Sequence, residues 1–544
     1  MIERVIENWL DNAIERSYEI PFCYTLIDEG YKVLHMTRHS SMEMGKDIIA
    51  VNQNGIPYAY QLKNVTGRRL TISQYRRDLQ NQLIPLAYTA IDPPALYTRQ
   101  PHIPVVVING DLDEDVQREI NNFNVVLERE GKNKVEVINR GALLDKFLKL
   151  RENLWPNNLT NIKNYLEIYI SNGSDLLNKE KFCKLIYSSL PFEQSRLTIA
   201  NLKRSLSSTA LICSSAILNY SNQKNYFAEF EAWIIYWSHA LSLCEKYSIN
   251  LRHISGELNL IKISIFNTLS NLCNDLIENP DGVDRYSHSL EEVFIYRMRL
   301  TLLLGLMSIY GLWRRLDGTS TDMEIILKET SHHDEFVKEF CLTNSNKLRL
   351  WGEYNVPQLF AFYLFYRKLD ATPRPDFLVL YRLIRSILKF NKIRSKKDNL
   401  PNPYYDYSVL PKLFGFEDEK IKEDFSGSSY TLEGIFHIFV RLNWKQHTKP
   451  FWDDYSKMVL KYFKYNKKWH FYLWRCKEGT EVSKLIKPTY LWSDLKNEAF
   501  ESNGDEIPDL IKKFPILYLC LLIVMPHRMN SSGVRWIHSE LLRI

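Results

Sequence analysis

Three polar residues in a short apolar stretch have the types and spacing that metal-assisted phosphate chemistry uses. Asp47 opens one strand-like run, and Gln61 and Lys63 close the next. Alternate side chains of a strand share a face, so Gln61 and Lys63 should point the same way, with Leu62 on the opposite, apolar side. If the two runs pair as a hairpin around the Asn-Gly turn at residues 54–55, Asp47 lies beside them.

The groups that would converge there match the ligands of a hard divalent cation. Mg²⁺ takes oxygen ligands and keeps several waters, and Mn²⁺ accepts the same donors. The Asp47 carboxylate, the Gln61 side-chain carbonyl and the Leu62 backbone carbonyl can supply such oxygens. Lys63 would then polarise the attacking water and stabilise charge that develops on a phosphate. The alternative is an ordinary hairpin whose polar strand ends face water.

Up to about residue 150, helix and strand signals alternate. One amphipathic helix opens the chain, and a second, from Tyr18 to Glu29, stops at Gly30. The later patterns predict strands over 31–37, 46–51 and 58–63, a helix over 72–90, a strand over 102–110, a helix after it, a strand over 135–140 and a helix over 141–150. This order predicts a small α/β domain with a mixed sheet over residues 1–150.

The element order, with Asp47 and the Gln61-x-Lys63 pattern, resembles the PD-(D/E)xK nuclease superfamily. Within it, the closest resemblance is to the Mrr-like restriction endonucleases, in which glutamine commonly replaces the acid before x-Lys. The resemblance covers about residues 15–140 and implies a restriction-endonuclease-like αβββαβ core. It also implies a Mg²⁺- or Mn²⁺-dependent enzyme that hydrolyses DNA phosphodiester bonds.

The resemblance extends toward the N-terminus. The pair Tyr18-Glu19 precedes a Gly-Tyr pair and a strand, as an aromatic-Glu pair does in the Mrr-like proteins. This implies that Glu19 is the helix-borne carboxylate that completes the catalytic and metal site. Because Pro21 follows closely, we expect Glu19 in the first helical turn, with Glu15, one turn earlier, as the alternative. The chain departs from the family pattern at Lys46, where an apolar residue is usual before the aspartate.

Four arginines follow the motif near the start of the next helix: Arg68, Arg69, Arg76 and Arg77. Beside Lys63, they could contact DNA phosphates without reading sequence. Gln74 and Gln80 are lesser candidates for backbone contact. The alternative is a solvated helix face with Asp78 as an ion-pair partner.

Beyond residue 150 the strand signal fades, and long amphipathic segments predict a mainly helical region. Charged or proline-rich breaks at 389–403 and 417–429 suggest a helical domain over 151–400 and a helical lobe over 401–544. Residues 514–525 are strongly apolar, but they are too few to cross a membrane and predict a buried helix.

Composition places the chain among intracellular globular proteins. It has 544 residues, 45% of them hydrophobic, and its eight cysteines show no CxxC pair. The first 16 residues contain acids within an amphipathic pattern and lack the apolar core of a secretion signal. We therefore expect a cytoplasmic protein that does not bind membranes. P-loop, GxSxG and HExxH motifs are absent from the sequence.

The charge of the chain is unevenly distributed. Residues 1–150 hold 18 Lys and Arg against 20 Asp and Glu, and the remaining residues hold 52 against 44. The basic surplus therefore lies in the C-terminal part, where it would favour contact with phosphates or simply solubility.

Two further segments of the C-terminal part have alternative interpretations. Residues 461–477 interleave cations with aromatic residues, a composition seen where bases stack and phosphates pair. The same spacing fits an amphipathic helix with an aromatic core face, which we predict here. His332 and His333, followed by Asp334, do not predict a metal site, because adjacent helical residues diverge by about 100°.

From these features we expect a metal-dependent endonuclease whose helical region serves sensing, specificity or assembly. By resemblance, such architectures are common among prokaryotic restriction and antiphage defence effectors. Cutting both DNA strands requires two sites, so a homo-oligomer or a complex with a second defence protein is expected. Two alternatives remain: a catalytically inactive nucleic-acid-binding or scaffold protein, and a nuclease that acts on RNA.

Overall fold

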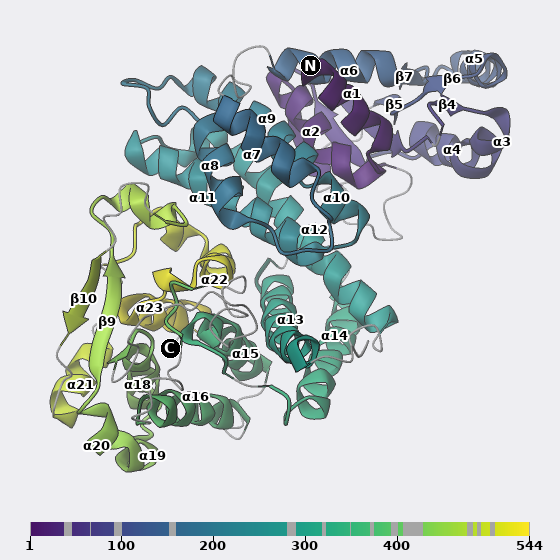
Figure 1. The fold of residues 1–544 in the computed structure, drawn as a ribbon. Coiled ribbons are helices and arrows are strands. Elements are labelled where there is room, and N and C mark those ends of the chain that lie inside the picture. The colour runs from purple at the N-terminus through teal and green to yellow at the C-terminus, as the bar shows by residue number, and fades with distance from the viewer. Residues whose placement is uncertain are drawn as a thin grey trace. The chain divides into compact units, whose positions relative to one another are not determined.

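The structure is a computed structural model whose ribbon is drawn in Figure 1. It describes residues 2–36, 46–65, 67–91, 101–151, 159–279, 290–317, 323–348, 350–369, 375–392, 401–405, 428–475, 482–486, 491–500 and 506–542. The chain divides into two compact units, Met1–Thr268 and Leu269–Ile544.

The first unit contains the predicted α/β region, and the predicted order of elements is confirmed. Its elements up to residue 151 are α1 (Ile2–Asn12), α2 (Glu15–Asp28), β1 (Lys32–Met36), β2 (Ile48–Val51), β3 (Pro57–Lys63), β4 (Arg69–Leu70), α3 (Ile72–Gln74), the π-helical turn η1 (Tyr75–Leu79), α4 (Gln80–Tyr88), β5 (Ile103–Ile108), β6 (Asp111–Leu112), α5 (Glu114–Arg129), β7 (Glu136–Ile138) and α6 (Arg140–Arg151).

Five strands form one mixed sheet in the order β1-β2-β3-β5-β7. The first three strands run antiparallel, with a short turn between β2 and β3, whereas β5 and β7 run parallel to β3 after helical crossovers. The predicted mixed sheet is therefore present. The short strands β4 and β6, which the sequence pattern did not reveal, form a separate two-stranded pair.

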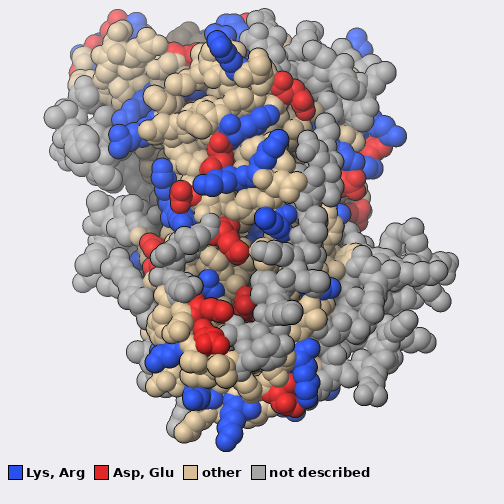
Figure 2. Space-filling model, turned by 90° about the vertical axis from the view of Figure 1, so that its left-hand side faces the viewer, with Lys and Arg blue, Asp and Glu red and all other residues tan. Residues whose placement is uncertain are grey.

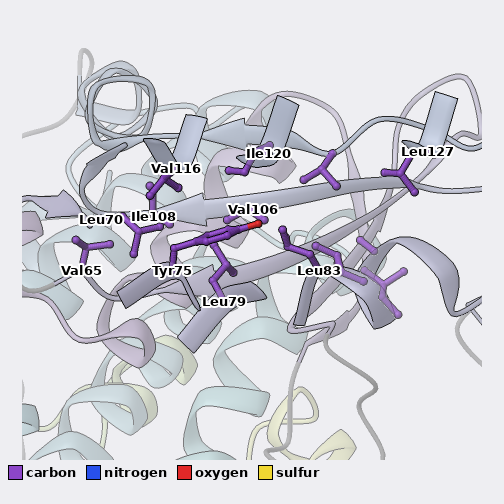
Figure 3. Packing of buried hydrophobic residues seen from close by; sticks show 14 of the residues in the cluster. Val65, Leu70, Tyr75, Leu79, Leu83, Val106, Ile108, Val116, Ile120 and Leu127 are labelled. Atoms are coloured by element: carbon purple, nitrogen blue, oxygen red, sulfur yellow. The ribbon is translucent and has the colours of Figure 1, made fainter. Parts of the chain in front are cut away.

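One face of the sheet is covered by η1, α4 and α5 through a single apolar cluster. Tyr75, Leu79 and Leu83 come from the first two elements, and Val116 and Ile120 come from α5 (Figure 3). All five side chains are buried against β3 and β5. The helical spacing of Tyr75, Leu79 and Leu83 explains why the sequence pattern predicted a helix over 72–90.

Helix α2 packs on the other face of the sheet, where the Phe22 ring meets the Tyr60 ring edge-on at 5.3 Å. The helix begins at Glu15, so Pro21 lies inside it and Glu19 lies in its second turn. The expectation that Glu19 lies in the first turn is therefore wrong. Burial of the aromatic side chains on this helix outweighs the backbone hydrogen bond that a proline removes. The predicted stop at Gly30 is confirmed by its positive φ of 86°.

The rest of the first unit is helical, and α2 packs closely on α9. Its remaining helices are α7 (Leu159–Tyr169), α8 (Lys179–Ser189), α9 (Ile199–Ala216), α10 (Leu218–Asn222), α11 (Tyr226–Lys246) and α12 (Ser255–Glu278), the last of which continues past the unit boundary. This division differs from the predicted boundaries at residues 150 and 400, which stay predictions.

The second unit is also mainly helical but contains a small sheet. Its helices are α13 (Leu290–Asp317), α14 (Met323–Thr343), α15 (Val356–Leu369), α16 (Pro375–Lys392), α18 (Leu432–Arg441), α19 (Lys445–Thr448), α20 (Trp452–Tyr455), α21 (Trp492–Phe500), α22 (Pro515–Val524) and α23 (Ser531–Leu542). Helix α22 is buried along its length after its first residue, which confirms the prediction for residues 514–525. Much of the two predicted breaks lies outside the described residues.

The small sheet overturns the helix predicted over residues 461–477. Residues 459–464 form strand β9 (Val459–Lys464), and the chain continues into a short 3-10 helix, η7 (Lys468–Tyr472). Strand β9 lies between β8 (Ser428–Ser429) and β10 (Val482–Ile486). An aromatic-rich run fits both the helical period of about 3.6 residues and the strand period of about two residues. Here the neighbouring strands supply backbone hydrogen bonds, and these stabilise the extended form.

Basic and acidic side chains are interspersed on the face drawn in Figure 2. Whether a lysine or arginine on this face can bind an external anion therefore depends on the charges next to it, because no single large electrostatic field of one sign covers the face. None of the helices in the described ranges combines the length and apolarity that a membrane crossing requires.

Candidate active site at the end of strand β3

The hairpin of β2 and β3 brings Asp47 and Gln61 together. Ile48 pairs with Tyr60 in the antiparallel ladder, and the Asp47 amide donates to the Tyr60 carbonyl at 2.8 Å. Asp47 therefore lies directly across from Gln61, where side chains share a face. The turn between the strands contains Gly55, whose φ of 78° suits a residue without a side chain.

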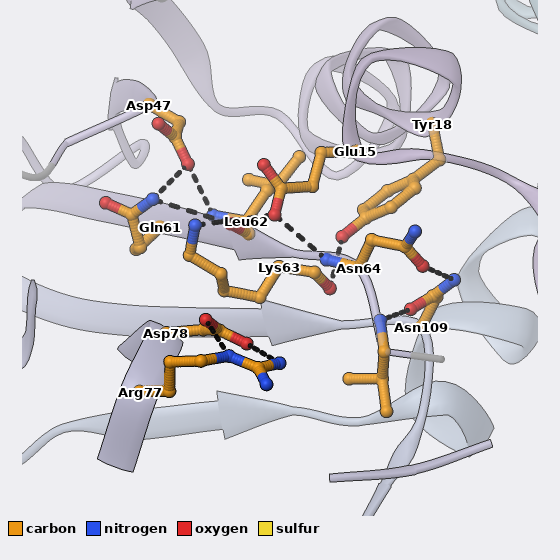
Figure 4. Close-up of polar contacts among 11 residues, drawn as sticks. Glu15, Tyr18, Asp47, Gln61, Leu62, Lys63, Asn64, Arg77, Asp78 and Asn109 are labelled. Atoms are coloured by element: carbon orange, nitrogen blue, oxygen red, sulfur yellow. Dashed lines mark hydrogen bonds and ion pairs between the residues drawn. The ribbon is translucent and has the colours of Figure 1, made fainter. Parts of the chain in front are cut away.

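The Asp47 carboxylate is held by two donors of β3. Its Oδ2 atom accepts hydrogen bonds from the Gln61 Nε2 atom and from the Leu62 amide, both at 2.6 Å (Figure 4). The Leu62 side chain points to the opposite face and is buried, as the strand period predicts. The polar and apolar faces at this end of β3 are therefore cleanly separated.

Lys63 meets a carboxylate from α2. Its Nζ atom lies 3.4 Å from Glu15 Oε1, and the same oxygen accepts from the Asn64 amide at 3.1 Å. The side chains of Lys63 and Glu15 are 17% and 39% exposed, so this pair borders solvent. The structure thus brings the alternative residue Glu15, rather than Glu19, into contact with Lys63.

Glu19 lies one helical turn after Glu15 and is buried. Burial raises the pKa of the Cys23 thiol, and the negative charge of Glu19 raises it further, so Glu19 lies near the Cys23 side chain. Residues four apart share one face of a helix, so both glutamates face the sheet. The structure therefore places two acidic groups of α2 on the side of the helix that approaches β3.

Tyr18 fixes α2 against the end of β3. Its hydroxyl donates to the Lys63 carbonyl at 2.8 Å, and the side chain is fully buried. Burial raises the pKa of Tyr18 well above its usual value, and the negative charges of Glu15 and Asp47 raise it further. The hydroxyl therefore stays protonated and remains a hydrogen-bond donor. Tyr18 was singled out in the sequence only as a marker of the neighbouring Glu19.

Asn109, which sequence reasoning missed as a site residue, connects three segments beneath the site. Its Oδ1 atom accepts from the Val65 amide at 2.7 Å, and its Nδ2 atom donates to the carbonyls of Leu10 and Ala13 at 3.1 and 3.2 Å. Nδ2 also reaches the Asn64 side chain at 3.0 Å. The signal that could have revealed it is a buried amide at the end of an otherwise apolar strand.

The donor set fits a divalent cation. Gln61 is buried, and its Oε1 atom has no hydrogen-bond partner among the described atoms. A half-turn of this amide exchanges Oε1 and Nε2, which would bring an oxygen beside the Asp47 carboxylate. Asp47, Gln61 and the Leu62 carbonyl, with a glutamate of α2, would then hold Mg²⁺ or Mn²⁺ through oxygen, as these ions prefer.

Three of the four arginines after the motif pair with acidic side chains. Arg77 donates to Asp78 through two nitrogens, each at 2.8 Å, which confirms the ion pair of the alternative interpretation. Arg68 pairs with Asp11 at 2.7 Å, and Arg76 lies 3.7 Å from Glu119.

Arg77 and Arg69 bear on the surroundings of the site. The bond from Arg77, and to a smaller extent the charge of Lys63, lowers the pKa of Asp78. Arg69 is exposed on β4 and lies across from Asp111 of β6. The cations around the site are thus largely matched by acids of the same chain.

Comparison with known proteins adds nothing to this geometry. No protein-family profile, curated protein or solved structure matches the chain.

A second cluster of possible metal ligands lies in the other unit. Glu433 and His437 of α18 and Glu498 of α21 place their ligand atoms within 4.8 Å of one another. However, Arg535 Nη1 lies 2.8 Å from His437 Nδ1, and a guanidinium can only donate. The neutral ring therefore carries its proton on Nε2, toward Glu498 at 3.7 Å. In this state that nitrogen is not a metal ligand.

The pair His332-His333 diverges as predicted. His332 is exposed, whereas His333 is buried and its Nε2 atom lies 3.1 Å from the Met307 carbonyl. Burial lowers the pKa of His333 to about 4, so the ring is neutral at neutral pH. Asp334 forms an ion pair with Arg315.

Proposed function

We propose that this protein is a divalent-metal-dependent nuclease that hydrolyses DNA phosphodiester bonds at the end of β3. One observation carries the proposal: acidic, amide and ammonium groups from three segments converge at a single strand end. Asp47 precedes β2, Gln61 and Lys63 close β3, and Glu15 opens α2. The mixed sheet with flanking helices is compatible with the coarse layout that the PD-(D/E)xK resemblance implies.

Each residue has a distinct role in the proposed reaction. A bound divalent cation would polarise the phosphate and lower the pKa of the attacking water. Asp47 and Gln61 would hold the cation, together with the Leu62 carbonyl and Glu19. Lys63 would place its ammonium next to the attacked phosphate and stabilise the negative charge that develops there.

The Lys63–Glu15 contact suggests how the ammonium is held in position. A lysine on four rotatable bonds otherwise samples many conformations, and a carboxylate at 3.4 Å restricts them. Glu15 borders solvent, so a phosphate that approaches Lys63 can replace or share this contact. Tyr18, through the Lys63 carbonyl, fixes the backbone from which the side chain extends.

A catalytically inactive nucleic-acid-binding protein is the second candidate. The observation that favours it is that Asp47 already accepts two short hydrogen bonds within the chain. A purely structural strand end would show the same contacts. This candidate predicts nucleic-acid binding without cleavage under every metal condition.

The decisive experiment incubates the purified protein with supercoiled plasmid and, separately, with a structured RNA. Each substrate is tested with Mg²⁺, with Mn²⁺ and with EDTA. We expect plasmid cleavage in either metal and none in EDTA. Cleavage of RNA alone would change the substrate class, and inertness on both substrates would favour the second candidate.

Lys63→Ala and a matched lysine variant complete the test. Lys134 is exposed and paired with Glu128 at 3.1 Å, so Lys134→Ala removes one paired lysine far along the chain from the motif. We expect Lys63→Ala to lose cleavage by at least about a hundredfold while Lys134→Ala retains it. Equal activity of the two variants would contradict the proposed role of Lys63.

A further inference from the structure

A segment of the second unit has a charge composition unlike the site just described. Residues 459–475, here called the basic aromatic segment, contain five Lys or Arg, seven aromatic residues and no Asp or Glu. None of its five cations forms an ion pair with an acid in the described ranges. An excess of cations over acids within a segment is a common electrostatic feature of surfaces that bind a polyanion.

The strand places these residues on two faces with different roles. Phe463 stacks on Tyr430 at 4.7 Å and lies 5.1 Å from the Tyr404 ring, so one face anchors the sheet. Tyr462 and Lys464 alternate with Phe463 and belong to the other face, where Tyr462 is half-buried and Lys464 is exposed. An aromatic ring and a cation are therefore neighbours on the face opposite Phe463.

The turn after β9 repeats the combination. Lys467 and Lys468 are exposed, and the Lys467 ammonium lies 5.9 Å from the centre of the Trp469 ring. Trp469 is half-buried, so part of its indole reaches the surface. A base that stacks on this ring would bring its phosphates next to two lysines.

Protection of a sheet edge explains only some of the lysines in this segment. Lysines often stand on edge strands, where they prevent pairing with other chains. Strand β9 pairs with β10 from Leu460 to Lys464, but it pairs with β8 only at Val459 and Leu460, so residues 461–464 have a strand partner on one side only in the described ranges. Edge protection therefore accounts for Lys461 and Lys464, whereas Lys467 and Lys468 lie in the turn after the strand and call for another account.

We infer that the basic aromatic segment binds single-stranded nucleic acid, with Lys464, Lys467 and Lys468 contacting phosphates and with Tyr462 and Trp469 stacking on bases. Single strands are favoured over duplexes because only unpaired bases offer their faces to aromatic rings. Either DNA or RNA has this chemistry. The inference does not depend on the nuclease proposal, because it uses neither the β3 site nor a metal.

The test measures fluorescence anisotropy of labelled oligonucleotides with the full chain in EDTA, so that no cleavage intervenes. The probes are oligothymidylate, oligouridylate and a DNA duplex of the same length, each of about 20 nucleotides, longer than a typical single-strand site. We expect at least one single strand to bind about tenfold or more tightly than the duplex. Equal or tighter duplex binding would overturn the inference.

A triple variant and a matched control locate the binding. Lys464→Gln, Lys467→Gln and Lys468→Gln together should weaken single-strand binding about tenfold or more, because three phosphate contacts are lost. The control replaces three exposed lysines that already pair with glutamates in the first unit: Lys134→Gln, Lys163→Gln and Lys184→Gln. Both triples remove the same charge, so an equal loss in the control would overturn the inference.

A third variant tests the stacking. Trp469→Leu keeps an apolar side chain but removes the indole face, and we expect it to weaken single-strand binding by about five- to a hundredfold. Unchanged affinity of a folded Trp469→Leu protein would overturn the role of this ring. The lysine variants replace exposed side chains and should fold normally, which a thermal melt checks.

Discussion

Cations in two regions of this molecule have different surroundings. Around β3, each of four cations lies within ion-pairing distance of an acid of the same chain: Lys63, Arg68, Arg76 and Arg77. In the basic aromatic segment, none of the five cations has such a partner in the described part of the chain. Paired cations hold a site in shape, whereas cations without internal acids leave their full charge to an external anion.

The comparison also concerns what positions each region. The β3 site rests on buried polar contacts, notably those of Asn109 and Tyr18, which join helices to strand ends. The basic aromatic segment rests on ring contacts of Phe463 and on backbone pairing of β9. The first arrangement gives the precision that a reaction requires, and the second gives an adaptable binding surface.

The largest expected effect separates chemistry from binding. Asp47→Asn removes the carboxylate charge but nearly keeps the shape of the side chain, and we expect plasmid cleavage to fall by at least about a hundredfold. Single-strand affinity in EDTA should stay within about twofold, since electrostatic binding depends on the cations. If a folded Asp47→Asn protein lost both plasmid cleavage and single-strand binding, the two regions would not have separate functions.

Next in size is the effect of Asn109→Ala on stability. The variant leaves the buried Val65 amide and the Leu10 and Ala13 carbonyls without their partner, so the free energy of unfolding should fall by about 2 to 4 kcal/mol. Urea denaturation measures it. Lys464→Gln is the contrast, with an expected change within about 0.5 kcal/mol for an exposed residue. Similar changes in the two variants would refute the role of Asn109.

The salt dependence of binding sharpens the comparison further. Each phosphate contact on a single strand contributes about 0.7 to the slope of log affinity against log salt concentration. The triple variant of Lys464, Lys467 and Lys468 should therefore have a slope shallower by about 2 than the unsubstituted protein, measured by anisotropy between low and moderate salt. A slope that does not change would mean that these lysines contact no phosphates.

The smallest effect comes from converting a paired cation into an unpaired one. Asp78→Asn removes the acid that receives two hydrogen bonds from Arg77, so this guanidinium becomes available to phosphate. We expect duplex affinity in EDTA to rise about threefold, the order of one surface charge contact. Glu130→Gln is the control, because Glu130 accepts from the Tyr88 hydroxyl instead. An equal rise in both variants would attribute the effect to overall charge.

The sequence predicted much of the first region because its signals are local. The hairpin turn lies midway between Asp47 and Gln61, so pairing of the two runs places them opposite each other without further information. The helix predicted over 72–90 corresponds to α3, η1 and α4, which end at Tyr88, and the helix expected after the strand over 102–110 is α5. The ion pairs of Arg68 and Arg76 could not be predicted, since Asp11 and Glu119 are distant in the chain.

The second region shows where local signals fail. Residues 461–477 have aromatic spacing that fits a helix, yet Leu460 and Phe463 are placed by partners far away in the sequence, Ser429 and Tyr430. Strand pairing is a contact between segments, and no property of one segment alone encodes its partner. The composition of the segment, by contrast, was visible from the start.

By itself the sequence determined the order of the elements in the first 150 residues, apart from the short strands β4 and β6, and also the opposition of Asp47 to Gln61 and the faces of Gln61 and Leu62. These features follow from the local geometry of helices, strands and turns, which a few neighbouring residues specify. Only the tertiary structure decided that Glu15 contacts Lys63, that Asn109 joins three segments and that residues 459–464 form a central strand. Each of these contacts joins segments that are distant in the sequence. Which distant segments pack together depends on the apolar area that they bury and on the hydrogen bonds that they satisfy across the whole fold.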